Sequence, residues 1–222
     1  MLLGLGTTLT PPHAAKLRVE SEIRMDIASI GFRAKTARAI AVAMGGRHSA
    51  PQYLARWEIS LHEPLIPGTA QPHHQVMELP WSDAVVVVRG LEMQIEAVAV
   101  ERLKKLLKEL GSRGHDVRTI GVVGSPDRDL EKIGNRHMRA HAGEGILFRR
   151  VLEYAANELK IHSASFSDRQ FETSASAQLR RTPQDIQKTL AAIGQSAGRP
   201  WRADERAAAT AAWLMLRKQA DK

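Results

Sequence analysis

The spacing of hydrophobic and polar residues changes several times along the first third of the chain, and each change predicts a different element. Residues 27–44 contain two short apolar runs around a basic turn at residues 33–36, a pattern typical of a β-hairpin. Residues 52–61 alternate between apolar and polar side chains, which predicts a third strand. Residues 62–82 contain four prolines, so we expect a long irregular segment there.

The rest of the chain alternates between helical and strand-like patterns. Apolar residues at helical spacing, with Lys and Glu on the opposite face, predict a long helix over residues 81–110. Further helices are expected over residues 144–159, from Thr182-Pro183 onward and over residues 204–218, with strands at residues 117–123 and 161–166. This order predicts a single α/β domain, with one mixed sheet that opens as a three-stranded antiparallel meander and carries helices on its faces.

We expect the domain to cover residues 25–222 and residues 1–24 to be a loose N-terminal leader. The leader shows no periodic pattern, and the first strand-like run begins directly after Met25. The leader also lacks a positive charge before its apolar stretch, so it is not typical of a signal peptide. Because no run of 18 apolar residues occurs, no membrane-spanning segment and no membrane partner are expected.

The amino-acid composition excludes several classes of function and favours one class of partner. The 222 residues include no cysteine, which excludes a disulfide framework, a Cys-ligated zinc site and a thiol nucleophile. A cysteine-free chain fits a reducing compartment, so we expect a cytoplasmic protein. Lys and Arg together number 32 against 24 Asp and Glu, and this net charge of +8 favours a polyanionic partner such as nucleic acid. The glycine-rich phosphate-binding loops and the G-x-S-x-G nucleophile motif are absent from the sequence.

The order of elements and three segments resemble the ribonuclease H-like fold, and within it the Holliday-junction resolvase (RuvC-like) group. The segments are the hairpin at residues 27–42, the strand, loop and Arg-bearing helix at residues 121–159, and the acidic, Ala-rich segment at residues 203–212. The resemblance implies that the chain binds nucleic acid, above all duplex or branched DNA. It also implies a homodimer, for which an exposed face of the Ala-rich last helix is a candidate surface.

The resemblance further implies carboxylates that hold two Mg²⁺ or Mn²⁺ ions, one activating water and one stabilising the leaving oxygen. The sequence meets this only in part, because Gly31 stands where the family's first strand carries Asp. The nearest acid on that strand is Asp26, and the last helix keeps Asp204 and Glu205. We therefore expect a nucleic-acid-binding protein with a degenerate acidic cluster and no required cofactor. The alternative is an active, structure-selective endonuclease that uses Asp26, Glu144 and Asp204, with Glu205 as a further acid.

Glu144 has two interpretations. It lies between two glycines at the expected start of a helix, where the helix dipole would stabilise a carboxylate by about 0.3–1 kcal/mol. Its other interpretation is a metal or water ligand that faces Asp204, because flanking glycines let the backbone approach a ligand closely.

Two histidines near Glu144 lead to a third hypothesis. His137, His141 and Glu144 would share one face of a continuous helix, and two histidines with a carboxylate bind transition metals. The expected helix start argues against a continuous helix here, which leaves exposed or hydrogen-bonded histidines as the alternative. The third hypothesis is a transition-metal enzyme using these three residues, with His141 as a ligand. Adjacent residues point apart, so we expect no shared metal at His73-His74.

Basic residues gather around the same parts of the chain. The candidates for nucleic-acid contact are Arg33, Lys35 and Arg38 on the hairpin, Arg136, Arg139 and Arg149 near the histidines, and Arg199 and Arg202 before the last helix. If the fold brings the hairpin end and the start of the last helix together, these cations line one groove and bind phosphates in a salt-sensitive way. The alternative is a scattered, solvated basic surface.

Overall fold

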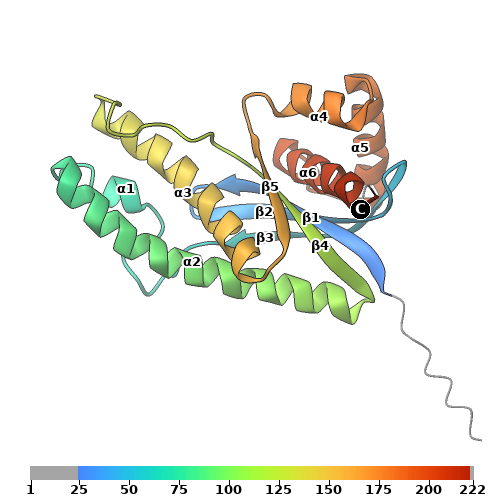
Figure 1. Cartoon of the computed structure of the whole chain (residues 1–222), viewed down its shortest axis with the longest axis horizontal. Helices are drawn as coiled ribbons and strands as arrows, with labels where there is room; N and C mark the ends of the chain where they lie inside the picture. The colour runs from blue at the N-terminus through green and yellow to red at the C-terminus, as the bar shows by residue number, and fades with distance from the viewer. Residues whose placement is uncertain (1–24, 221–222) are drawn as a thin grey trace, which may run out of the picture.

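A five-stranded mixed sheet forms the centre of the computed structural model, which describes residues 25–220 (Figure 1). The strands are β1 (Asp26–Lys35), β2 (Arg38–Arg47), β3 (Ala50–Ser60), β4 (His115–Gly124) and β5 (His162–Ser167). Their order is β3-β2-β1-β4-β5; β2 is antiparallel to both β1 and β3, whereas β4 is parallel to both β1 and β5. The predicted α/β class, one mixed sheet that opens as a three-stranded antiparallel meander and carries helices on its faces, is confirmed. The predicted leader, residues 1–24, lies outside the described residues.

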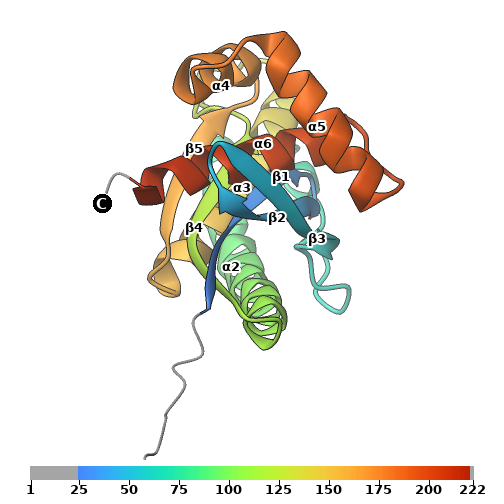
Figure 2. The ribbon, with the colours of Figure 1, turned by 90° about the vertical axis from the view of Figure 1, so that its right-hand side faces the viewer.

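Helices cover both faces of the sheet. They are α1 (Pro72–Gln75), α2 (Trp81–Ser112), α3 (Arg136–Glu158), α4 (Phe171–Leu179), α5 (Pro183–Ala197) and α6 (Ala203–Ala220). One core joins α2 and α3 to one face, and a second core joins α4, α5 and α6 to the other (Figures 1 and 2). Within the described part of the chain, no helix is both long enough and apolar enough to cross a membrane.

Local details differ from the sequence prediction in four places. The hairpin turns at Thr36-Ala37, where Ala37 has a φ of 64°, so Arg33 and Lys35 belong to β1 itself. Helix α3 begins at Arg136 instead of residue 144, because the Asn135 side chain accepts a hydrogen bond from the Met138 N–H and caps the helix. Two short helices, α1 and α4, form where no helix is predicted above.

The side of β1 that faces α6 is built from small residues. Ser29 Oγ donates to the carbonyl of Ala212 at 2.6 Å, and a Cβ atom at Gly31 would lie 1.9 Å from the carbonyl oxygen of Ala208. Gly121 pairs with Gly31 in the sheet and faces the same helix, with 2.9 Å between a built Cβ and the Ala211 carbonyl oxygen. The backbone of α6 therefore lies directly on β1 and β4.

This close packing corrects one expectation. Residues 208–216 of α6 are all buried, and Trp213 is fully enclosed in the second core. The Ala-rich helix therefore offers no exposed face for a homodimer over these residues. Its small side chains serve the contact with the sheet, which the sequence pattern alone did not distinguish from an outer surface.

Candidate functional site

The carboxyl ends of β1, β4 and β5 meet the start of α6 at one edge of the sheet. Arg33 comes at the end of β1, with its Nη2 3.4 Å from Asp168 Oδ2 and its Nε 3.6 Å from Asp204 Oδ1. The Nζ of Lys35 lies 3.6 Å from the same Asp204 oxygen. The predicted meeting of the hairpin end and the start of the last helix is therefore observed, and its charges form a cluster of alternating sign.

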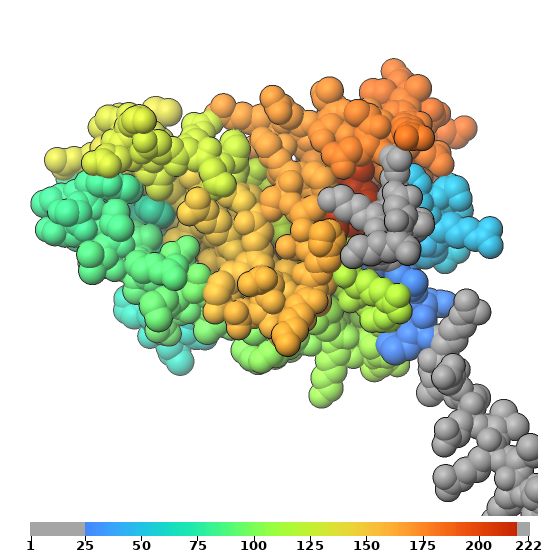
Figure 3. Space-filling model, viewed as in Figure 1, coloured from blue at the N-terminus to red at the C-terminus, as the bar shows by residue number. Residues whose placement is uncertain are grey.

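A depression with a volume of about 520 Å³ lies beside this cluster. We call it the arginine groove; it is lined by Arg33, Ser125, Pro126, Arg128, Met138, His141, Ala142, Asp168 and Arg169. Arg128 and Arg169 are exposed, and neither makes an ion pair within residues 25–220. They come from the β4–α3 and β5–α4 connections, which lie next to each other in the space-filling view (Figure 3). The groove therefore presents two cationic side chains that have no carboxylate partner among the described residues.

The structure does not bring together the carboxylates proposed for the nuclease alternative. Asp26 is the first residue of β1, whereas Arg33 and Lys35 near its last residue contact Asp204. At about 3.3 Å per residue, the two ends of this strand lie about 30 Å apart. Glu205 is buried and accepts a hydrogen bond from the Arg202 N–H at 2.8 Å, so it caps its own helix. Asp26 cannot join Asp204 because the two residues lie at opposite ends of β1.

This edge also does not fit a pair of Mg²⁺ or Mn²⁺ ions. Gly31 has no space for the side chain that would supply a bridging carboxylate, because α6 backbone atoms occupy that space. The guanidinium of Arg33 lies between Asp168 and Asp204, where its positive charge satisfies both carboxylates and opposes a divalent cation. The chemistry supported by these residues is the binding of an anion.

Glu144 lies inside α3, is 1% exposed, and its carboxylate contacts α1. Its Oε1 accepts hydrogen bonds from the backbone N–H groups of His73 at 2.9 Å and His74 at 3.3 Å, and it lies 3.3 Å from His74 Nδ1. Burial raises the pKa of Glu144 to about 7, although the two backbone hydrogen bonds act in the opposite direction. Both sequence interpretations of Glu144 are corrected, since the residue neither starts a helix nor faces the last one.

The two glycines beside Glu144 allow close packing. A Cβ atom at Gly143 would lie 2.5 Å from the ring of His73, and one at Gly145 would lie 2.3 Å from Ser125 Oγ. Helix α1 and the end of β4 therefore pack against the backbone of α3 at this point. The glycines do allow a close approach to the backbone, as the sequence suggested. The approaching groups, however, are side chains of the protein and not a ligand.

Three histidines converge next to Glu144. Because α3 is continuous, His137 and His141 share one face, and their Nε2 atoms lie 2.9 Å apart. His74 of α1 completes the group, with its ring centroid 4.6 Å from that of His141 and 5.5 Å from that of His137. Desolvation, with His137 and His74 nearby, lowers the pKa of His141. The expected break in the helix is wrong, because the Asn135 cap starts the helix before both histidines.

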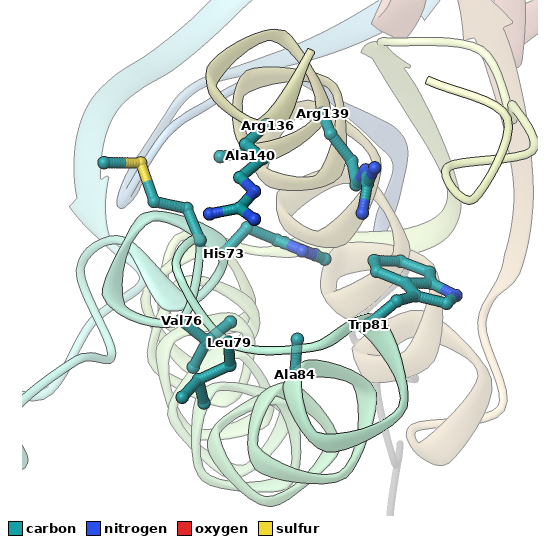
Figure 4. Close-up of a pocket in the computed structure, with 9 residues that line it drawn as sticks. His73, Val76, Leu79, Trp81, Ala84, Arg136, Arg139 and Ala140 are labelled. Carbon is teal, nitrogen blue, oxygen red and sulfur yellow. The ribbon is translucent and has the colours of Figure 1, made fainter. Parts of the chain in front are cut away.

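His73 and His74 point apart, as the sequence suggested. His73 points into a small cavity next to Trp81, Arg136 and Arg139 (Figure 4). Burial lowers the pKa of His73 to about 4, which keeps its ring neutral near pH 7. Only His74 therefore takes part in the histidine group.

Several predicted nucleic-acid contacts have other partners. Arg149 is buried, donating through Nε to the Ser125 carbonyl at 2.9 Å and through Nη2 to Asp127 at 2.5 Å. Arg136 forms an ion pair with Glu78 at 2.8 Å, and Arg38 forms one with Glu58 at 3.1 Å. Arg139 donates to the Ile133 carbonyl at 2.9 Å and lies over the Trp81 ring. The assignment of Arg149 to a phosphate is corrected, because its guanidinium holds the β4–α3 connection.

Two other predicted contacts for nucleic acid are not engaged in ion pairs among the described residues. Arg199 and Arg202 are exposed just before α6, and neither has an ion-pair partner among residues 25–220. Sequence reasoning missed Arg128, Asp168 and Arg169. Their position directly after two parallel strands is the signal that would have found them, since ligand sites of such sheets form at the carboxyl ends of strands.

Comparisons with known proteins concern the fold. No protein-family model matches the chain, and no curated protein matches it by sequence. Three solved structures are similar over most of their length. Thermus thermophilus RuvC is 11% identical, with a TM-score of 0.45, and the match covers 84% of this chain and 92% of that chain. The same protein in complex with Holliday junction substrate is 12% identical, with a TM-score of 0.48, covering 88% and 97%.

The third structure is the yeast mitochondrial Holliday junction resolvase Ydc2, which is 13% identical with a TM-score of 0.43, covering 91% of this chain and 84% of its own. At these identities the likeness concerns the fold alone.

Proposed function

We propose that this protein binds nucleic acid at the arginine groove and holds it without two-metal cleavage. The observation that carries the proposal is the pair of exposed, unneutralised arginines, Arg128 and Arg169, beside Arg33 at the carboxyl edge of the sheet. A guanidinium binds phosphate oxygens in a bidentate manner, and several such contacts give affinity with little dependence on base sequence. The net charge of +8 supports the same partner at longer range.

The choice of duplex or branched DNA follows from the resemblance to the resolvase group. The Arg33 guanidinium between Asp168 and Asp204 supports a binding role at the edge where metal ions would otherwise be expected. We expect duplexes and four-way junctions to remain uncut in Mg²⁺ or Mn²⁺.

A homodimer and a cytoplasmic location remain predictions, and light scattering of the purified protein measures the oligomeric state.

The double substitution Arg128→Ala/Arg169→Ala tests the groove. Loss of two phosphate contacts is expected to weaken binding about tenfold at low salt and to reduce the slope of log affinity against log salt by about 2. The measurement is fluorescence anisotropy of labelled duplex and four-way-junction DNA over a series of KCl concentrations. EDTA in every sample separates groove binding from any effect of metal ions.

The matched control is Lys105→Ala/Lys108→Ala. Both lysines are exposed on the second half of α2, which leads to the amino end of β4 at the opposite edge of the sheet, and the change in charge is the same. The control is expected to change affinity less than threefold, by screening of distant charges. Equal losses in the two double variants would mean that the charge of the whole surface, and no groove, binds DNA.

A further inference from the structure

The histidine group next to the arginine groove has the composition of a metal site. We propose that His74, His137 and His141 bind one transition-metal ion such as Zn²⁺, and that Glu144 is the carboxylate that orients His74. Imidazole nitrogens favour Zn²⁺, Cu²⁺, Ni²⁺ and Co²⁺ over Mg²⁺, so this site differs in chemistry from the acidic sites discussed above. The proposal does not depend on nucleic-acid binding.

The spacing of the nitrogens supports the proposal. One nitrogen from each of the three rings lies within 4.8 Å of the other two. In a tetrahedral zinc site with Zn–N bonds of about 2.0–2.1 Å, two ligand nitrogens lie about 3.4 Å apart. The Nε2 atoms of His137 and His141 are 2.9 Å apart, so a small rotation of either ring reaches that spacing. Both rings are exposed on the surface of α3, where rotation meets little resistance.

Glu144 supplies the second, independent observation. Metal-binding histidines usually donate their other ring N–H to a carboxylate, which fixes the tautomer and the ring orientation. Glu144 Oε1 lies 3.3 Å from His74 Nδ1, which leaves Nε2 of His74 as the metal ligand. The second oxygen, Oε2, is buried and has no hydrogen-bond partner in the described part of the chain. A buried carboxylate directed at one histidine of a three-histidine group matches this arrangement.

The site would leave one coordination position for another ligand. Three protein ligands and a fourth position for water or an anion are typical of catalytic zinc sites. His141 also lines the arginine groove, so an ion held by the three histidines would lie at the margin of that groove. A phosphate oxygen in the groove is a ligand of suitable chemistry for the fourth position.

Metal binding itself is the test, with the full-length, tag-free protein stripped by EDTA and dialysed. Isothermal titration with Zn²⁺ and the visible absorption of added Co²⁺ are measured without nucleic acid. One ion per chain with tetrahedral Co²⁺ absorption is the expected result. His137→Ala and His74→Ala are expected to lower the affinity at least 100-fold, and Glu144→Gln about 10- to 100-fold, because Gln orients the ring less strongly.

The control is His162→Ala, which removes an exposed histidine at the start of β5. Unchanged binding in that variant, with loss in the others, supports the site. The exposed position of His137 makes its substitution safe for folding, and circular dichroism checks the variants of the buried residues. Absence of one-to-one binding, or equal loss in His137→Ala and His162→Ala, would overturn the proposal and show a hydrogen-bonded histidine pair only. Arg128→Ala/Arg169→Ala should still bind metal, so failure of either proposal leaves the other testable.

Discussion

Replacing Gly31 by aspartate is expected to unfold the protein, although the substitution would restore the acid that the resolvase group carries on its first strand. The first added atom would lie 1.9 Å from the Ala208 carbonyl oxygen and 2.5 Å from the Ala212 nitrogen. Both are backbone atoms of α6, so no change of side-chain rotamer relieves the contact. Overpacking alone costs about 1–3 kcal/mol or more, and an unpaired buried carboxylate adds several kcal/mol. Since a domain is stable by about 5–15 kcal/mol, most of that stability is lost.

Urea denaturation followed by circular dichroism measures this effect. Gly31→Ala isolates the steric part and is expected to lower the free energy of unfolding by about 1–3 kcal/mol or more. The matched control is Gly90→Ala in α2, where nothing lies within 4 Å of a built Cβ atom. That control is expected to stabilise the protein by up to about 1 kcal/mol, because alanine favours a helix interior. A fully stable Gly31→Asp variant would contradict the direct contact between α6 and β1.

The order of elements follows from the sequence because each element carries its own local signal. Thr182 illustrates this well: its side chain accepts the Asp185 N–H, and Pro183 occupies the first turn, as the residue types predicted. The role of Gly31 has no such local signal. A glycine in a strand indicates a close approach of some group, but its neighbours Ala208 and Ala212 lie near the other end of the chain.

The sequence predicts the parts of the site that depend on where strands and helices begin and end. It does not predict which charged residues are buried and therefore bind partners inside the protein. The meeting of Arg33 with Asp204 follows from the end of the first strand and the start of the last helix. Arg149 and Glu144 looked like solvent-facing charges, yet both are buried in contacts within the protein. His74 was missed because its partners are on another helix and nothing in the intervening proline-rich segment indicates where it leads.

The second large effect concerns the two carboxylates at the arginine groove. Asp168→Asn/Asp204→Asn is expected to tighten DNA binding, whereas a nuclease that used Asp204 would lose its activity. Arg33 now divides its charge between both carboxylates, and Lys35 contacts one of them. Removing both negative charges frees these cations and also removes repulsion toward phosphate. At about 1 kcal/mol for each charge in a solvated setting, the affinity is expected to rise about 30-fold at low salt.

The measurement is the same anisotropy titration, with Asp26→Asn/Asp116→Asn as the matched control. Those two acids lie at the amino ends of β1 and β4, so the control makes an equal change in net charge at the opposite edge of the sheet. Its effect should stay below about threefold and vanish at high salt, because exposed charges beyond about 10 Å are screened at 0.1 M. Loss of the first-turn acid of α6 costs only about 0.3–1 kcal/mol of stability, so the variant should fold. Weaker binding in Asp168→Asn/Asp204→Asn would show that these carboxylates position the cations instead of competing with phosphate for them.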